Sequence, residues 1–318
     1  MTMSNAAEAT PLCPVTGRPA VRRVQWVPSR LLIDLWRIVF GVDARGSFAG
    51  TGRFGLWESP TGLYFFDPPR EGDHQFYSEL YAWLKRRGFI TVETVRHEFL
   101  IAASHIAAGA RVLDVGCGLG GFRACVPQAR YVGLDPHMAA HAVIPDVRSE
   151  TLGQHLVGHA GAYDAVCCFE VIEHVRDPKA LYAELVQAAK PGGLVCVSVP
   201  RYPSAMTRIP NFLINAPPHH LTWWTEAALR FLAKNAGVEV MSVENVPFGS
   251  DSGIYWIERF SPIKCRDVHF RGAFGWHAAS LISSLLGIAA SRLLRVPKMD
   301  RNEGIGLVMI ARRPGPAA

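Results

Sequence analysis

A glycine-rich loop and an acid downstream of it are the residues in this sequence best suited to bind a nucleoside. In the stretch RVLDVGCGLGG, glycines allow the backbone to turn tightly and to approach a ligand that any side chain would exclude. Gly116, Gly118 and Gly121 fit the dinucleotide pattern G-x-G-x-x-G. With Gly120 as the third glycine, the same loop fits a second spacing, G-x-G-x-G. Asp135, in YVGLDP, can accept hydrogen bonds from both ribose hydroxyls of either ligand, so it indicates nucleoside binding without choosing between them.

Three histidines and two glutamates could transfer protons or bind a metal ion. Glu170, Glu173 and His174 have i, i+3 and i+4 spacing, which places them on one face of a helical turn, where they could bind a divalent metal. His219 and His220 are adjacent in APPHHLTWWT, where two prolines stiffen the chain. A histidine with a pKa near neutral suits the removal of a proton from a hydroxyl group. We therefore take His174, His219 and His220 as the candidate catalytic residues, although a helix-capping or backbone-bonding histidine is the alternative for the adjacent pair.

The elements that position these residues alternate between strand and helix from residue 111 onward. β-rich runs predict strands at 111–115, 130–134, 164–169, 194–199, 238–246 and 305–312, with a weakly marked one near 146–148. Asp177 before Pro178 predicts one helix start, and Thr225 predicts another. Leu80 and Val92 belong to apolar residues at helical spacing that predict helices before the sheet. This order is typical of a doubly wound α/β sheet, which binds ligands at the carboxyl ends of its strands.

Composition sets broad limits on the class of protein. The 318 residues can bury a full core, and the seven cysteines include no C-x-x-C pair. Because the first residues also lack a signal-peptide pattern, we expect a reducing, cytoplasmic setting. The formal net charge of +6 suits anionic ligands, nucleic acid or an anionic membrane surface, but no dense Lys/Arg run concentrates it, so charge alone selects none of these. From the motifs we expect a small-molecule partner and no nucleic-acid partner. Residues 1–10 are small and polar and predict a disordered lead.

Four segments in chain order resemble class I S-adenosylmethionine (SAM) methyltransferases of the small-molecule type. VLDVGCGLGG has the D-x-G-x-G-x-G spacing, and YVGLDP follows it. YDAVCCFEVIEHVRDP (163–178) resembles the fourth-strand segment, and KPGGLVCVSVP (190–200) resembles the fifth strand after a P-G-G turn. The resemblance covers residues 92–246 and the last strand. It implies SAM as cofactor and a Rossmann-like seven-stranded sheet whose final strand, in GIGLVMIARR, is antiparallel and inserted near the edge.

The resemblance also implies which residues bind the cofactor. They are Asp114, Gly116, Cys117, Gly118, Gly120, Asp135, Pro136, Glu150, Thr151, Leu152 and Glu170. Asp114 and the glycine loop would lie near the methionine moiety, Asp135 would bind the ribose, and the loop after the third strand would cover the adenine. The E-x-x-E-H letters are similar to a metal-associated cluster of ubiquinone-type O-methyltransferases. Because the same letters recur in relatives for which no metal is implied, we expect no metal, with His174 lining the cavity.

Two segments outside the resemblance need their own interpretation. CPVTG and ESPTG resemble the knuckles of a zinc ribbon that precedes the catalytic domain in many small-molecule methyltransferases, but only Cys13 remains of four ligands. We therefore expect residues 11–72 to be a metal-free, β-rich module before a methyltransferase domain at 73–318. AFGWHAASLISSLLGIAASRLLRV (273–296) is strongly apolar, but its uninterrupted part is shorter than the roughly 20 residues that span a bilayer. We expect an apolar helical insertion at about 249–300 that packs on or covers the domain; homodimer contact and peripheral membrane contact are the alternatives.

These patterns predict a SAM-dependent methyltransferase that acts on a small-molecule acceptor, preferably at a hydroxyl oxygen because a histidine base is available. The glycine pattern also permits a nicotinamide-dependent oxidoreductase, and a non-catalytic SAM-binding protein is a third reading. A nucleic-acid methyltransferase is less favoured, because amino-methylating members usually carry N/D-P-P-Y/F/W after the fourth strand, where this chain has EVIEH.

Overall fold

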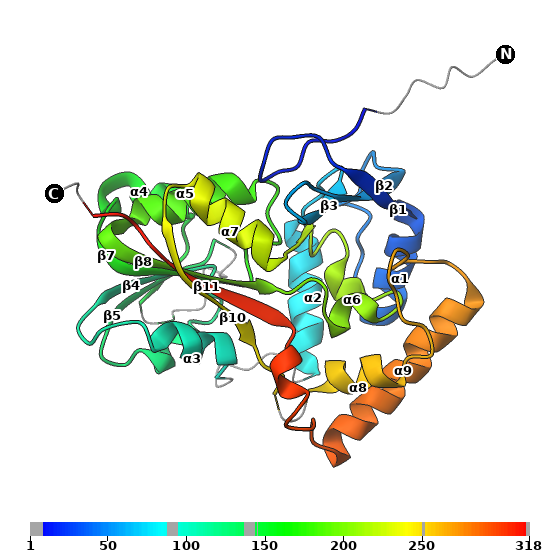
Figure 1. Ribbon diagram of the computed structural model, residues 1–318. Coiled ribbons are helices and arrows are strands. Elements are labelled where there is room, and N and C mark those ends of the chain that lie inside the picture. Colours follow the sequence, from blue (N-terminus) through cyan, green and yellow to red (C-terminus); the bar gives the residue numbers. More distant parts are fainter. Residues whose placement is uncertain (1–8, 88–94, 137–143, 145, 250–251, 316–318) are drawn as a thin grey trace.

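The computed structural model describes residues 9–87, 95–136, 144, 146–249 and 252–315. Residues 1–8 of the expected disordered lead, and Val92 of the expected helical spacing, lie outside this part of the chain. The described residues contain a seven-stranded sheet of order β10-β11-β8-β7-β4-β5-β6 and a four-stranded sheet of order β1-β2-β3-β9. Figure 1 shows the larger sheet flanked by helices, with the smaller sheet beside it.

The seven-stranded sheet confirms the predicted fold class. Its strands are β4 (Arg111–Val115), β5 (Arg130–Leu134), β6 (Val147–Arg148), β7 (Tyr163–Phe169), β8 (Ala189–Pro200), β10 (Glu239–Val246) and β11 (Gly306–Arg312). The first five are parallel to one another, whereas β11 is antiparallel to both β8 and β10. Because the carboxyl ends of β4, β5, β6 and β7 meet at one edge, the residues that follow these strands lie close together.

Helices cover both faces of this sheet because its strands are apolar on both sides. They are α3 (His97–Ala103), α4 (Leu152–His159), α5 (Pro178–Ala188) and α7 (Glu226–Asn235), and Figure 1 shows α3 on the face opposite α5 and α7. In β7, the adjacent Cys167 and Cys168 point to opposite faces and join different hydrophobic clusters. The Asp177 carboxylate accepts a hydrogen bond from Ala180 N (2.8 Å), which confirms the predicted start of α5.

The smaller sheet combines three strands from the N-terminal part of the chain with one strand that comes much later in the sequence. It contains β1 (Arg22–Pro28), β2 (Arg53–Glu58), β3 (Tyr64–Asp67) and β9 (Thr222–Trp223), with α1 (Ser29–Phe40) after β1. Residues 11–72 therefore do not complete this sheet alone, because β9 follows the segment that contains His219 and His220. Trp36 in α1 also donates a hydrogen bond to the carbonyl of Pro217 (2.9 Å). Both contacts hold the histidine segment against the N-terminal sheet.

The zinc-ribbon resemblance is not confirmed by the two knuckle-like turns. Cys13 Sγ accepts hydrogen bonds from Val15 N (3.4 Å) and Thr16 N (3.5 Å), so this thiol stabilises its own turn. In the second turn, Glu58 forms an ion pair with Arg22 (2.6 Å). Within the described ranges, no set of three metal-binding side chains forms in this module.

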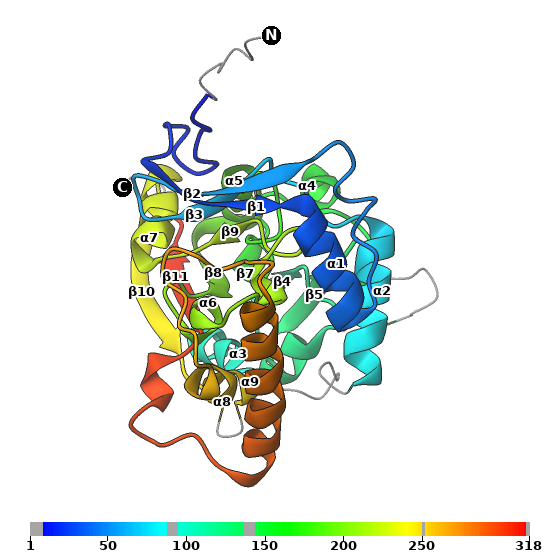
Figure 2. The same ribbon diagram turned by 90° about the vertical axis from the view of Figure 1, so that its right-hand side faces the viewer.

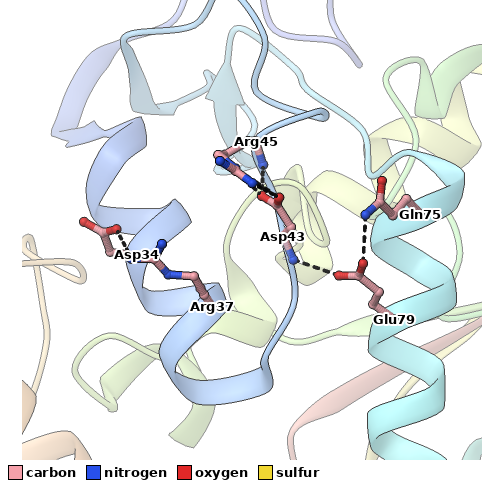
Figure 3. Close-up of polar contacts among 6 residues, drawn as sticks. All are labelled: Asp34, Arg37, Asp43, Arg45, Gln75 and Glu79. Carbon is pink, nitrogen blue, oxygen red and sulfur yellow. Dashed lines mark hydrogen bonds and ion pairs between the residues drawn. The ribbon is translucent and has the colours of Figure 1, made fainter.

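A network of polar contacts fixes helix α2 (His74–Arg86) to the segment that follows α1 (Figure 3). Glu79 accepts hydrogen bonds from Asp43 N (2.8 Å) and from Gln75 Nε2 (2.9 Å). The Arg45 guanidinium hydrogen-bonds the Asp43 carboxylate and lowers its pKa to about 2. Asp73 caps the helix by accepting a hydrogen bond from Phe76 N (2.8 Å). These contacts fix the helix that carries Tyr77 toward the histidine cluster.

The expected apolar insertion is helical. It contains α8 (Gly253–Phe260) and α9 (Phe274–Leu293), and the short helix α6 (Ala205–Arg208) lies next to α8. Figure 1 shows α9 at the outer edge of the molecule, and Figure 2 shows it in front when that side faces the viewer. Among the described residues, α9 is the one helix whose length and composition would suffice to cross a membrane, and 17% of its apolar window is buried.

Candidate active site

The backbone of the glycine loop distinguishes between the two spacings found in the sequence. Gly116, Gly118 and Gly120 all have left-handed φ angles, of 70°, 52° and 74°. Gly121 instead begins the 3-10 helix η1 (Gly121–Cys125). The loop therefore needs glycine at the G-x-G-x-G positions. Because a five-residue 3-10 helix follows, the loop does not lead into the α-helix N-terminus that binds a pyrophosphate.

Hydrogen bonds fix this loop against the end of β5. Gly116 N donates to the carbonyl of Leu134 (2.8 Å), and Gly118 N donates to Asp135 Oδ2 (2.9 Å). A Cβ on Gly118 would meet no atom within 4 Å, so the backbone faces open space there. The Cys117 thiol instead packs inward, since a Cβ on Gly133 would lie 2.6 Å from it.

Carboxyl groups gather behind the loop. Asp114 is buried and accepts a hydrogen bond from the Tyr131 hydroxyl (2.8 Å), and burial raises its pKa to about 7. Glu170 has a φ of 57°, rare for a residue with a side chain, and accepts a hydrogen bond from Ser198 Oγ (3.2 Å). Burial raises the pKa of Glu170 to about 7 as well.

Glu173 adds a third carboxyl group to this region. Its side chain is fully buried, and neither carboxyl oxygen has a hydrogen-bond partner among the described residues. Burial raises its pKa well above the ordinary value. Arg96, next to α3, lies close enough to lower the pKa of Asp114, Glu170 and Glu173, but its guanidinium also pairs with Glu98. This acidic region suits a cationic ligand, and SAM has a sulfonium and an ammonium group, so the residues fit that cofactor.

The loop expected to cover the adenine follows β6 and lies next to Asp135. Asp135 N donates to the carbonyl of Arg148 (3.0 Å), which joins the ends of β5 and β6. Thr151 caps α4 by accepting a hydrogen bond from Gln154 N (3.2 Å), and Leu152 is buried. Glu150 lies 2.9 Å from His155 Nδ1, so its carboxylate is already engaged. Pro136 is exposed just beyond β5.

The three candidate catalytic histidines form one cluster. The ring centroids of His174, His219 and His220 lie 4.4 to 4.8 Å apart. His174 follows β7, whereas the other two belong to the segment held by β9 and Trp36. The Tyr77 ring of α2 lies 5.9 Å from that of His219 and 6.3 Å from that of His174. The structure thus brings together the two histidine motifs that the sequence separates by more than forty residues.

Hydrogen bonds define the proton positions on two of these rings. His220 Nδ1 lies 3.1 Å from Asn215 Oδ1, and His174 Nδ1 lies 2.6 Å from the carbonyl of His219. Both oxygens only accept, so both Nδ1 atoms donate and both Nε2 atoms keep a lone pair. His174 Nε2 is 3.7 Å from Glu173 Oε1, which links the cluster to the acidic region.

Burial changes the basicity that the sequence predicted. It lowers the pKa of His174 to about 4 and the pKa values of His219 and His220 well below the ordinary value. The expected near-neutral pKa is therefore wrong, because the rings lose water that would stabilise their charged forms. All three imidazoles are neutral at pH 7, so each can accept a proton, but the lowered pKa makes each a weaker base than a free imidazole.

The same cluster could hold a metal ion. One ligand atom from each of His174, His219 and His220 lies within 4.8 Å of the others, and His219 Nδ1 is buried without a hydrogen-bond partner among the described residues. Three neutral imidazoles suit zinc or another transition metal. Within the described ranges this is the only such set, and it differs from the Glu170, Glu173 and His174 trio considered from spacing.

Three residues of the site were not predicted from the sequence. Tyr131 could have been found, because it alternates with Gly133 on β5 and Gly133 pairs with Asp114 across the sheet. Arg96 and Tyr77 come from segments without a motif, and only the three-dimensional structure brings them to the site.

Comparisons with known proteins agree with this geometry. Residues 91–243 match the family model described as "Methyltransferase domain". A ubiquinone biosynthesis O-methyltransferase from Escherichia coli is 37% identical over 102 residues, which cover 28% of this chain and 42% of the relative. The chain thus matches less than half the length of these curated relatives.

Many solved structures also resemble this chain, among them two methyltransferases. A SAM-dependent methyltransferase from Archaeoglobus fulgidus has a TM-score of 0.47 and 18% identity, and covers 73% of this chain and 99% of its own. The 1,6-didemethyltoxoflavin-N1-methyltransferase of Burkholderia thailandensis has a TM-score of 0.46 and 16% identity, with coverage of 79% and 95%.

The sheet order, the conformation of the glycine loop and the acidic residues behind it define a nucleoside-binding α/β domain for a cationic cofactor. Together with the family match, they show that the chain contains a class I SAM-dependent methyltransferase domain, with SAM as its cofactor.

Proposed function

We propose that the protein methylates a hydroxyl oxygen of a small molecule. The observation that carries this proposal is the cluster of neutral histidines beside the acidic cofactor region, with the Nε2 lone pair of His220 available to accept a proton. The name of the Escherichia coli relative specifies O-methylation, which supports an oxygen acceptor. Bound SAM would supply an activated methyl group, so the chain's own residues need mainly to align the acceptor and remove its proton.

His220 is the histidine best oriented to act as the base. Asn215 holds its Nδ1–H at 3.1 Å, so Nε2 points its lone pair away from that contact. Trp223 Nε1 donates to the carbonyl of Asn215 (2.8 Å), which fixes the residue that orients the ring. The rings of Tyr77 and the buried Trp36 lie 5.9 Å and 6.4 Å from that of His219 and shield the cluster from water. His219 and His174 would complete the acceptor pocket, with His174 contacting the acidic region.

A metabolite screen with isotope-labelled SAM tests this proposal. The purified protein is incubated with a small-molecule extract, and mass spectrometry locates the labelled methyl group. We expect a labelled methyl ether that His220→Ala produces far more slowly. SAM binding without transfer to any small molecule would favour a non-catalytic SAM-binding protein, and label on nitrogen or carbon would contradict O-methylation.

A further inference from the structure

Helix α9 turns its small residues toward the protein and its large apolar residues outward. Its buried residues are Ala279, Ser283, Gly287 and Ala290. A Cβ on Gly287 would lie 2.5 Å from the backbone nitrogen of Ile257, so α8 packs directly against this small-residue face. The helix therefore attaches to the body through its small side chains and leaves its large ones unburied.

The outward face of α9 is a continuous apolar surface. Its large members are Phe274, Leu281, Ile282, Leu285, Leu286 and Leu293, which are between 50% and 87% exposed. At 3.6 residues per turn, these six side chains fall within an arc of about 140°. A soluble protein normally turns such a face toward its core, so this one is suited to an apolar partner.

Charges are confined to the two ends of this helix. Between Asp267 and Asp300 the chain has no acidic residue, and its basic residues are Arg271, Arg292, Arg295 and Lys298. The apolar face thus lies between basic ends, a distribution that complements an anionic surface with an apolar interior.

We propose that α9 docks the protein on the surface of a bilayer that contains anionic lipids. The outward apolar side chains enter the boundary between headgroups and acyl chains, and the basic residues at both ends contact the headgroups. This inference goes beyond the proposed function and does not depend on it.

The connections of α9 favour a position along the surface rather than across the bilayer. Before the helix, Phe270 is buried and its ring lies 6.3 Å from that of Phe66 in β3. After it, residues 294–305 return to β11 in the seven-stranded sheet. Both ends thus belong to one globular body, and a spanning helix would require this return segment to cross lipid with unpaired backbone groups.

A second copy of the chain is a poorer partner for this face. Both ends of α9 are basic, so parallel and antiparallel pairing of two such helices would each place basic residues beside basic residues. An anionic lipid surface has no such repulsion.

Vesicle sedimentation with the full-length protein tests the proposal. We expect more binding to phosphatidylcholine vesicles that contain phosphatidylglycerol than to phosphatidylcholine alone, with the difference lost in high salt. Leu281→Gln combined with Leu285→Gln should lower the bound-to-free ratio about tenfold or more. Arg292→Glu combined with Lys298→Glu should remove the preference for phosphatidylglycerol.

The control carries the same change on another exposed helix. Ile38→Gln combined with Val39→Gln alters exposed apolar residues of α1 and should leave vesicle binding unchanged. Unchanged melting temperatures would show that each variant folds. Equal binding by the leucine variant and the wild type would overturn the proposal. Failure of the wild type to bind either type of vesicle would also overturn the proposal. If the wild type fails to bind vesicles and the leucine variant dissociates a dimer, the apolar face instead contacts a second copy of the chain.

Discussion

At the end of β5, the Asp135 carboxylate lies beside the glycine loop, where it can accept hydrogen bonds from the ribose hydroxyls of a nucleoside. Removing it would leave those hydroxyls without a partner in the complex. We expect Asp135→Ala to weaken SAM binding by about 1 to 3 kcal/mol, measured by calorimetry. Asp164→Ala is the matched control, because that carboxylate bonds Arg111 N (2.7 Å) at the opposite edge of the sheet. Equal affinities for the wild type and Asp135→Ala would move the ribose site elsewhere.

The histidine cluster makes a second prediction at the scale of residues. If His220 removes the acceptor's proton, His220→Ala should lower turnover by about 10²- to 10⁴-fold while SAM affinity stays nearly constant. The base must be neutral, and burial lowers the pKa values of these rings, to about 4 for His174. At saturating SAM the rate should therefore stay level as the pH falls through 6.5. Full activity in His220→Ala, together with loss of turnover in His174→Ala, would assign the base to His174.

The acidic region predicts how SAM affinity depends on pH. The raised pKa values of Asp114 and Glu170, both about 7, mean that these groups are largely neutral at pH 6 and largely ionised at pH 8. Ionised carboxylates attract the sulfonium cation, so SAM affinity should rise as the pH rises from 6 to 8. S-adenosylhomocysteine lacks that charge and should show a smaller rise. Calorimetry at both pH values checks this, and a SAM affinity that falls over this range would contradict it.

In the glycine loop, the neighbouring residues Gly120 and Gly121 differ in how strictly the backbone requires glycine. Gly120 has a φ of 74°, and a Cβ there would lie 3.3 Å from Val147, whereas Gly121 lies in the 3-10 helix η1. Gly120→Ala should therefore cost about 1 kcal/mol of stability or more and weaken SAM binding, and Gly121→Ala should be milder in both respects. Thermal unfolding and SAM titration of the two variants measure this. A larger effect of Gly121→Ala on SAM affinity would favour the dinucleotide spacing.

Elements with strong local signals could be predicted from the sequence. Strands β4, β5, β7 and β11 were predicted within one residue at each end, because apolar runs between turn residues mark them. β6 was weakly marked since it has only two residues in the sheet. The pairing of β3 with β9 carried no local signal, because it joins residues that are far apart in the chain. The sequence also did not predict that α2 packs against the histidines, because that contact joins distant segments too.

At the scale of the whole molecule, the candidate site lies where the two sheets meet. The glycine loop and the acidic residues come from the larger sheet, whereas the segment with His219 and His220 is held by the smaller one through β9 and Trp36. The sequence correctly predicted the methyltransferase class and SAM as its cofactor, but the histidine cluster depends on contacts between distant segments. The N-terminal sheet thus positions the histidine side of the candidate site.

Calorimetric titration of the purified protein with SAM and with NAD tests the central claim most directly. Both ligands would use the glycine loop and Asp135, but only SAM suits a loop without a following α-helix N-terminus and with carboxyl groups behind it. The account predicts that SAM and S-adenosylhomocysteine bind with one site per chain and that NAD gives no signal. Binding of NAD with no signal from SAM would contradict it.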